Sequence, residues 1–170
     1  ASSGWAVGAQ GTIIHWNGAV WSNVTNPTTA GLFSVFMLNA SLGWITGGHG
    51  AVMLRWNGIE WSIVTCPSSY TYHSLFMVSA TDGWAVGEDG IIIHWNGTQW
   101  SPVTAPTTKP LMSVFMVSTS DGWAVGIDGT IIRWNGTQWI PEFPSFIILP
   151  LFMIATLLAV IVHRRRIPKW

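Results

Sequence analysis

Residues 82–100 read DGWAVGEDGIIIHWNGTQW, and related stretches occur at four places along the chain. Each copy holds a Gly-Trp step, then a Trp-Asn-Gly turn, then a closing tryptophan, and the copies follow at intervals of about 40 residues. Units of this size are too small to bury their own apolar faces, so the pattern indicates a repeat architecture. Every tryptophan except Trp170 belongs to the pattern: Trp5, Trp16, Trp21, Trp44, Trp56, Trp61, Trp84, Trp95, Trp100, Trp123, Trp134 and Trp139.

The third unit, residues 74–104, shows the strand content of one repeat. Short apolar and β-branched runs alternate with Asp-Gly and Asn-Gly turns. This alternation predicts four antiparallel strands. No stretch before Phe146 has helical periodicity, so each unit is expected to be a small four-stranded sheet.

The Asn17-Gly18 turn predicts a strand register. A two-residue loop would place Trp16 opposite Ala19 and Ile14 opposite Trp21. The two tryptophans would then be diagonal neighbours on one sheet face. Burying one indole side chain removes about 150–250 Å² of its surface from water, so this pair is expected to stabilise the packing of the sheet.

Both faces of each predicted sheet carry apolar residues, so each sheet must lie between others. Radial stacking of sheets achieves this, and the predicted fold is an all-β propeller of about four four-stranded blades. The blades are expected over residues 1–140, in units near 1–31, 32–71, 72–110 and 111–140. A linear β-solenoid is the alternative, although its coils are usually shorter than this repeat.

The repeat resembles a known family. Residues 76–90 read FMVSATDGWAVGEDG, residues 93–97 read IHWNG, and Trp100 follows. This is similar to the BNR/Asp-box-like repeat of photosystem II assembly-factor-like propellers, and the resemblance extends from Gly4 to Trp139. It implies a propeller and a role as assembly factor for a membrane complex. Trp-Asn-Gly stands where the family usually has Asp-Gly-Gly, so no functional residue is carried over from that turn.

Family propellers usually have more blades than the four repeats found here. The chain also begins at Ala1 in the middle of a repeat, without a methionine or a signal peptide. Both features favour a fragment of a larger propeller.

Charged residues make up 8% of the chain, against about 25% in a typical soluble domain. Four of the seven basic residues lie together at the C-terminus, so the remainder of the chain is mildly acidic. The body has no basic stripe, which argues against nucleic-acid binding. Cys66 is the only cysteine, so neither an intrachain disulfide nor a cysteine-based metal site is expected.

The C-terminal segment has the pattern of a membrane anchor. Residues 146–162 are uncharged and strongly apolar, and we expect a transmembrane helix over residues 146–163. The following residues, 164–170, would form a basic cytoplasmic tail. The positive-inside rule, applied to Arg164, Arg165 and Arg166, then places the propeller outside the cell.

Residues 141–145 form the predicted linker between the propeller and this span. Pro141, Glu142 and Phe143, followed by the apolar span and an arginine run, resemble the PEF-CTERM sorting signal of archaeal surface proteins. That resemblance implies cleavage by an archaeosortase and attachment of a lipid. A plain single-span anchor is the alternative.

A basic residue precedes each turn tryptophan: His15, Arg55, His94 and Arg133. An anion-binding ring is one interpretation. The predicted register favours ordinary cross-strand pairs instead, with Arg55 opposite Glu60, His94 opposite Gln99 and Arg133 opposite Gln138.

Other polar positions are interpreted as turn residues or modification sites. Asp-Gly steps at Asp82, Asp89, Asp121 and Asp128 suit turns better than calcium binding, which needs several converging oxygens. Four sequons make glycosylation possible at Asn23, Asn39, Asn96 and Asn135. We expect no catalytic residue, metal site or cofactor, because no constellation of the required side chains stands out.

The sequence therefore predicts a non-enzymatic, membrane-anchored surface propeller that acts in binding or scaffolding. A glycan, a peptide or a surface protein would be its ligand, and the loop over residues 67–73 would make contacts. The alternatives are a structural component of the cell envelope, an assembly or stability factor for a membrane complex, and a sialidase-like or glycosidase-like hydrolase with an upstream catalytic part.

Overall fold

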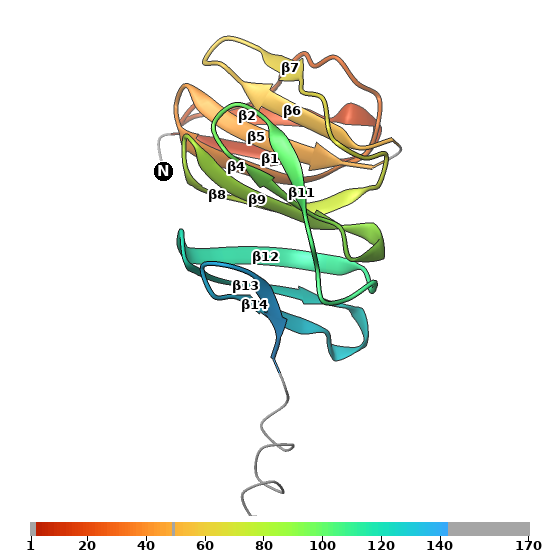
Figure 1. Ribbon diagram of the computed structural model, residues 1–170. Helices are drawn as coiled ribbons and strands as arrows, with labels where there is room; N and C mark the ends of the chain where they lie inside the picture. The colour runs from red at the N-terminus through yellow and green to blue at the C-terminus, as the bar shows by residue number, and fades with distance from the viewer. Residues whose placement is uncertain (1–2, 49, 143–170) are drawn as a thin grey trace, which may run out of the picture.

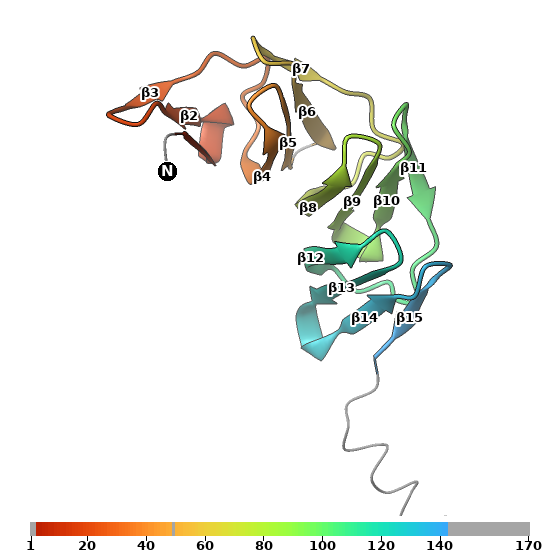
Figure 2. The ribbon, with the colours of Figure 1, turned by 90° about the vertical axis from the view of Figure 1, so that its left-hand side faces the viewer.

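The computed structural model describes residues 3–48 and 50–142, which form an all-β arc of four antiparallel sheets (Figures 1 and 2). The first sheet, blade 1, contains three strands: β1 (Gly4–Val7), β2 (Ile13–Trp16) and β3 (Trp21–Asn23). Blade 2 contains β4 (Leu32–Asn39), β5 (Leu42–Gly47), β6 (Val52–Trp56) and β7 (Trp61–Ile63).

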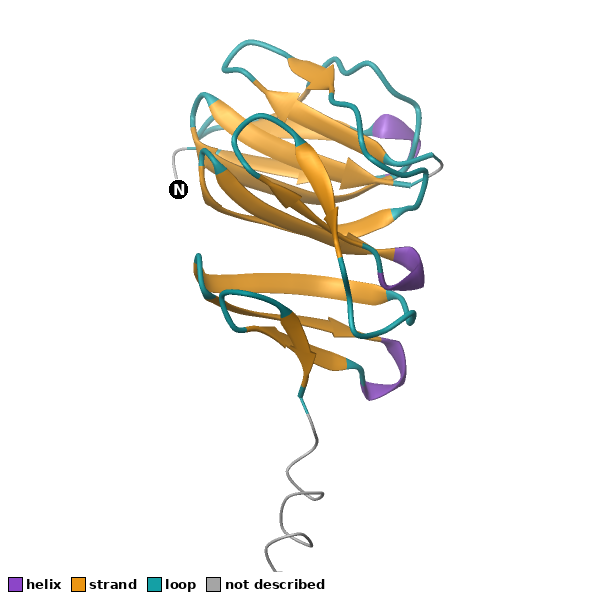
Figure 3. Cartoon of the chain, in the orientation of Figure 1, coloured by secondary structure: helices purple, strands orange, loops and turns teal. Residues whose placement is uncertain are grey.

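Blades 3 and 4 repeat the arrangement of blade 2. Blade 3 contains β8 (Tyr72–Ser79), β9 (Asp82–Gly87), β10 (Ile92–Trp95) and β11 (Trp100–Val103). Blade 4 contains β12 (Leu111–Ser118), β13 (Asp121–Gly126), β14 (Ile131–Trp134) and β15 (Trp139–Pro141). Short 3-10 turns at Ala9–Gly11, Glu88–Gly90 and Ile127–Gly129 connect β1 to β2, β9 to β10 and β13 to β14 (Figure 3).

The strands follow sequence order within each sheet, so every pairing is a hairpin between consecutive strands. The first strands β4, β8 and β12 line the concave side of the arc, and the last strands lie at its outer rim (Figure 2). This is the radial stacking of a propeller. Blades 2 to 4 have the predicted four strands, and blade 1 has three, with β1 paired only to β2 within the described residues.

The Trp-Asn-Gly hairpin differs from its predicted register by two residues. Trp16 pairs directly with Trp21, not with Ala19. The reason is the side chain of Asn17, whose Oδ1 accepts hydrogen bonds from the backbone N–H groups of Ala19 and Val20. This Asx-type turn starts at Asn17, with Gly18 at φ 99°. Because the shift is an even number of residues, both tryptophans stay on the same face.

Tryptophans form the cores between neighbouring blades. The Gly-Trp residue Trp44 of blade 2 lies against Trp95 and Trp100 of blade 3, with ring centroids 4.8 and 5.4 Å apart. The same triad recurs as Trp5 with Trp56 and Trp61, and as Trp84 with Trp134 and Trp139. Blades 1, 2 and 3 therefore each pack the Gly-Trp tryptophan against the other two tryptophans of the next blade.

Within the described residues, no helix is long and apolar enough to cross a membrane. The predicted span over 146–163 and the basic tail with Arg164, Arg165 and Arg166 lie outside those residues, as does Phe143 of the sorting motif. Pro141, assigned to the linker by the sequence, pairs with Ile132 as the last residue of β15.

Candidate binding surfaces

The basic residue before each turn tryptophan stacks on the Gly-Trp tryptophan of its own blade. The rings of His15 and Trp5, and those of His94 and Trp84, have centroids 4.4 Å apart. The guanidinium carbon of Arg133 lies 5.2 Å from the ring centroid of Trp123, within the range of a cation–π contact. These contacts follow from the register, which pairs each basic residue with that tryptophan on the adjacent strand.

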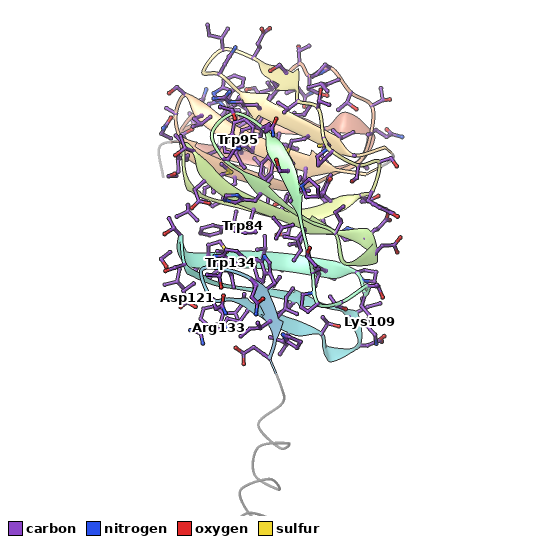
Figure 4. All side chains as sticks on the ribbon, viewed as in Figure 1. Trp84, Trp95, Lys109, Asp121, Arg133 and Trp134 are labelled. Atoms are coloured by element: carbon purple, nitrogen blue, oxygen red, sulfur yellow. The ribbon has the colours of Figure 1, made fainter. Side chains whose placement is uncertain are left out.

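Two of the basic residues also meet a carboxylate at the start of the second strand. His94 Nε2 lies 2.9 Å from Asp82 Oδ1, and Arg133 Nε donates to Asp121 Oδ1 at 2.9 Å (Figure 4). In blade 1, His15 Nε2 lies 2.9 Å from Ser3 Oγ instead.

The cross-strand pairs expected from the sequence are therefore wrong. The residues opposite Arg55, His94 and Arg133 on the last strands are Ser62, Ser101 and Ile140, because the Asx-type turn moves Glu60, Gln99 and Gln138 into the loop. Asp82 and Asp121, which the sequence interprets as turn residues, also contact basic side chains: the carboxylate of Asp82 lies beside His94, and that of Asp121 accepts a hydrogen bond from Arg133.

Arg55 differs from its equivalents because Leu42 stands where blades 3 and 4 have an aspartate. Within the described residues Arg55 makes no ion pair. By contrast, Arg133 pairs with Asp121, and Lys109 Nζ lies 2.7 Å from Asp128 Oδ2 (Figure 4). The Arg55 guanidinium lies 5.5 Å from the ring centroid of Trp44. The predicted anion ring thus reduces to one exposed cation.

A hollow of about 450 Å³ surrounds this cation, which we call the Arg55 hollow. Two asparagines and two serines contribute polar groups to its lining, and Leu42 and Trp56 contribute apolar groups. The polar residues are Asn39, Ser41, Asn57 and Ser62. An exposed guanidinium beside amides and hydroxyls can bind a carboxylate together with neighbouring peptide groups.

The other Asp-Gly steps serve the backbone. Asp89 and Asp128 have φ values of 52° and 54° inside the 3-10 turns, a left-handed conformation that aspartate tolerates better than most residues. Among the residues that the structure describes, no group of three or more His, Cys, Asp and Glu side chains could hold a metal ion.

The four sequon asparagines lie on exposed positions, but three use their side-chain oxygen locally. Asn96 and Asn135 cap their hairpin turns, each accepting the backbone N–H groups of the residues two and three positions later. Asn39 accepts from the backbone and the hydroxyl of Ser41. Asn23 ends β3 at an exposed position. Glycosylation at these sites stays a prediction.

The loop over residues 67–73 is partly structural. Tyr72 is fully buried as the first residue of β8, and its hydroxyl lies 2.8 Å from Ser68 Oγ. Burial raises the pKa of Tyr72 to about 12. Burial also raises the pKa of the neighbouring Cys66 thiol to about 12. Tyr70, which is 43% exposed, is the loop's tyrosine available for contacts.

The two ends of the arc expose residues whose equivalents are buried or half-buried in the other blades. Trp21 of blade 1 is 50% exposed, whereas its equivalents Trp61, Trp100 and Trp139 are each 4% exposed. At the other end, Phe115 is 57% exposed and Val117 is 63% exposed on the outer face of blade 4. The repeats are alike in their residues, so the sequence does not distinguish the ends of the arc from its middle.

The comparisons with known proteins agree with this architecture. No protein-family profile matches the chain, and no curated protein sequence gives a significant match. Among solved structures, one described as YCF48 bound to D1 peptide has a TM-score of 0.60 and 22% identity, over 69% of this chain and 41% of that one. YCF48 from Cyanidioschyzon merolae has a TM-score of 0.65 and 18% identity, over 85% and 54% of the two chains. This chain thus spans about half the length of the structures it matches, and what it shares with these YCF48 structures is the β-propeller fold.

Proposed function

We propose that this chain is a non-enzymatic, polypeptide-binding propeller that acts as an assembly or stability factor for a membrane complex. The likeness to YCF48 supports this role over a general surface scaffold, because one matched structure is described with a bound peptide. The repeat also resembles that of photosystem II assembly-factor-like propellers. The observation that carries the proposal on this chain is the exposed Arg55 in its polar hollow, which makes no ion pair within the described residues.

The Arg55 hollow suits a peptide with an acidic group. The guanidinium is planar and offers several N–H donors, so it can bind a carboxylate with two parallel hydrogen bonds. Trp44 and Trp95 lie 5.5 and 5.9 Å from the guanidinium carbon and limit the conformations of the side chain. Less conformational entropy is then lost when a ligand binds.

Membrane attachment would keep the propeller near newly made membrane proteins. In this proposal residues 146–163 span the membrane, or are replaced by a lipid after sorting at the PEF-CTERM-like motif. Before any cleavage, Arg164, Arg165 and Arg166 lie on the cytoplasmic side, so the propeller faces the exterior. The same anchoring favours the second candidate function, a surface scaffold that binds a glycan or a neighbouring surface protein.

Site-specific photocrosslinking in the source cells tests the proposal. A photoreactive amino acid replaces Ser62 in the Arg55 hollow, and the matched control replaces Ser101, the equivalent residue opposite His94. We expect position 62 to crosslink to pulse-labelled membrane-protein subunits before they reach their mature complex. Crosslinks that appear only with mature surface polymers, or equally from both positions, would contradict the assembly role.

Charge substitutions at two sites refine this test. Arg55→Gln removes the unpaired cation, and Lys109→Gln removes an exposed cation near the 3-10 turn of blade 4. We expect the first substitution to reduce the crosslinks from position 62 several-fold and the second to leave them unchanged. Equal crosslinking in the two variants would show that Arg55 does not carry the recognition.

A further inference from the structure

Leu42 is the exception among four equivalent positions. The residues before the Gly-Trp steps of blades 1 to 4 are, in order, Ser3, Leu42, Asp82 and Asp121. The serine and the two aspartates each contact the basic side chain of their own blade through an oxygen atom. A leucine side chain offers no hydrogen-bond acceptor. Arg55 therefore lacks, at this position, the partner that its equivalents have.

Asn39 is a second exception, and it lies directly opposite Leu42 in the strand pairing. The equivalent residues of blades 3 and 4, Ser79 and Ser118, close the same turn with a hydroxyl that accepts the backbone N–H two positions later. Asn39 makes this bond with its amide oxygen, 2.9 Å from the backbone nitrogen of Ser41. Because a serine is sufficient for the turn, the turn does not require the amide Nδ2 group of Asn39.

Asn57 contributes another amide group to the Arg55 hollow. Its Oδ1 accepts the backbone N–H groups of Ile59 and Glu60, at 2.8 and 2.9 Å. In the same way, Ser41 donates both its N–H and its hydroxyl to Oδ1 of Asn39. Because the turns already use both amide oxygens, the groups that these two asparagines can offer to a ligand are the NH₂ donors.

The Arg55 hollow is therefore rich in donors, and among the described residues no carboxylate lines it. The acid closest to Arg55 in the chain, Glu60, lines a separate hollow of about 250 Å³ with Thr25 and Trp61. The guanidinium supplies one positive charge and several N–H donors. A complementary ligand has one negative charge and further acceptor oxygens close to it.

We propose that this hollow holds an aspartate or glutamate side chain within an extended segment of a partner polypeptide. The ligand carboxylate binds the Arg55 guanidinium, in the role that an internal aspartate has in blade 4. The amides of Asn39 and Asn57 donate to the backbone carbonyls on either side of the acidic residue. Leu42 determines that blade 2 binds the ligand, because an internal carboxylate at this position would compete for the arginine.

Nuclear magnetic resonance of the full chain in detergent, with isotope-labelled asparagine and arginine, tests this recognition. The probe is the N-acetyl, N-methylamide derivative of aspartate, which carries one carboxylate between two peptide carbonyls. We expect saturable shifts of the side-chain signals of Asn39, Asn57 and Arg55. The same derivative of asparagine has the shape without the charge and should give no saturable shift. Acetate, which has the carboxylate alone, should bind about three- to tenfold more weakly.

Substitutions at position 42 test the role of the leucine. Leu42→Asp gives Arg55 an internal carboxylate like those of blades 3 and 4, and we expect it to weaken binding of the aspartate probe at least about tenfold. Leu42→Asn is the matched control and should weaken binding far less, because a neutral amide competes less strongly than a carboxylate. Asp121→Leu combined with Ser118→Asn transfers both features to blade 4, so the signal of Arg133 should then respond to the probe.

Asn39→Ser removes the amide and keeps the turn, because serine already closes this turn in blades 3 and 4. We expect the aspartate probe to bind about three- to tenfold more weakly to this variant, since one hydrogen bond to a backbone carbonyl is lost. The affinity for acetate should not change, because acetate has no such carbonyl. Circular dichroism would confirm that each variant folds.

Three results would overturn the inference. One is unchanged binding of the aspartate probe to folded Leu42→Asp, and another is equal binding of the aspartate and asparagine probes. The third is a glycan on Asn39 in the protein purified from its source cells. The sugar would then occupy the Nδ2 group that the ligand needs, at the sequon formed by residues 39–41.

This inference rests on the proposed function, since it names the chemistry recognised at the same hollow, but the two can fail separately. Crosslinks from position 62 to membrane-protein subunits that persist undiminished in Leu42→Asp would overturn the recognition of an acidic side chain and leave the assembly role standing. Binding of the aspartate probe that Leu42→Asp abolishes, together with crosslinks only to mature surface polymers, would support the recognition and contradict the assembly role.

Discussion

Trp84 of blade 3 packs against Trp134 of blade 4 with ring centroids 4.6 Å apart, while its own ring also stacks on His94 (Figure 4). Trp84 therefore contacts both a polar side chain of its own sheet and the apolar face of the next sheet. In a repeat protein each unit is stabilised by contacts with its neighbours, so this position is expected to govern stability.

Trp84→Ala should strongly destabilise the propeller. The side chain is 2% exposed, and truncating a buried tryptophan costs about 3–5 kcal/mol of unfolding free energy. Trp21→Ala removes the same atoms from a side chain that is 50% exposed, so the expected loss is about 1 kcal/mol or less. Urea denaturation of the two variants measures the contrast. Equal losses would show that Trp21 is buried in solution by a contact outside the described residues.

Gly83→Ala should destabilise blade 3 through a single contact. The new methyl group would overlap the sulfur of Met77, and overpacking of this kind costs about 1–3 kcal/mol. Adding Met77→Ala should relieve the overlap, so the double variant loses less than the sum of the two single losses. Gly4→Ala is the control and should be nearly neutral, because a Cβ there makes only ordinary contacts, at 3.6 Å or more, with the described residues. Additive losses in the Gly83 cycle would rule out the methionine as the cause.

The Asp121–Arg133 pair should contribute more than the Lys109–Asp128 pair. Both are ion pairs, but the side chains of Asp121 and Arg133 are 31% and 44% exposed, against 64% and 50% for Asp128 and Lys109. We expect Asp121→Asn to cost about 0.5–1 kcal/mol and Asp128→Asn to cost close to nothing, because exposed pairs are screened by water. Denaturation at low and high salt would check this, and the cost of Asp121→Asn should fall as salt rises.

The sequence predicted the sheets and the tryptophan packing because both depend on local alternation of apolar residues. It missed the hairpin register because Asn17 acts through its side chain, which a two-residue loop rule does not consider. The sequence did not predict the Arg133–Asp121 pair, because the two residues lie on neighbouring strands and are 12 residues apart in the chain. Aligning the repeats could have revealed the unpaired cation, because Leu42 aligns with Asp82 and Asp121.

The residues of blade 1 alone do not show whether its glycines are sterically required. Gly4 and Gly8 match glycines in the other repeats, and only the neighbouring strand reveals whether a glycine is sterically required. Membrane anchoring and sorting, which the sequence predicts for residues beyond 142, stay predictions.

Cys66 should react slowly with thiol reagents until the protein unfolds. Burial raises the pKa of its thiol from 9.0 to about 12, so almost no thiolate, the reactive form, is present in the folded protein at pH 8. The shift also predicts a pH dependence of stability. Between pH 9 and 12 the unfolded thiol loses its proton while the folded thiol keeps it, so the free energy of unfolding falls as pH rises through this window.

Tyr72 adds to this pH dependence with the same sign, because burial raises its pKa from 10.0 to about 12. Urea denaturation at pH 8 and pH 10.5 should show lower stability at the higher pH. Cys66→Ala should reduce that difference without abolishing it, since Tyr72 still titrates. Rapid alkylation of Cys66 under native conditions at pH 8, at the rate of the urea-unfolded chain, would show that the thiol is not buried and remove the basis of this prediction.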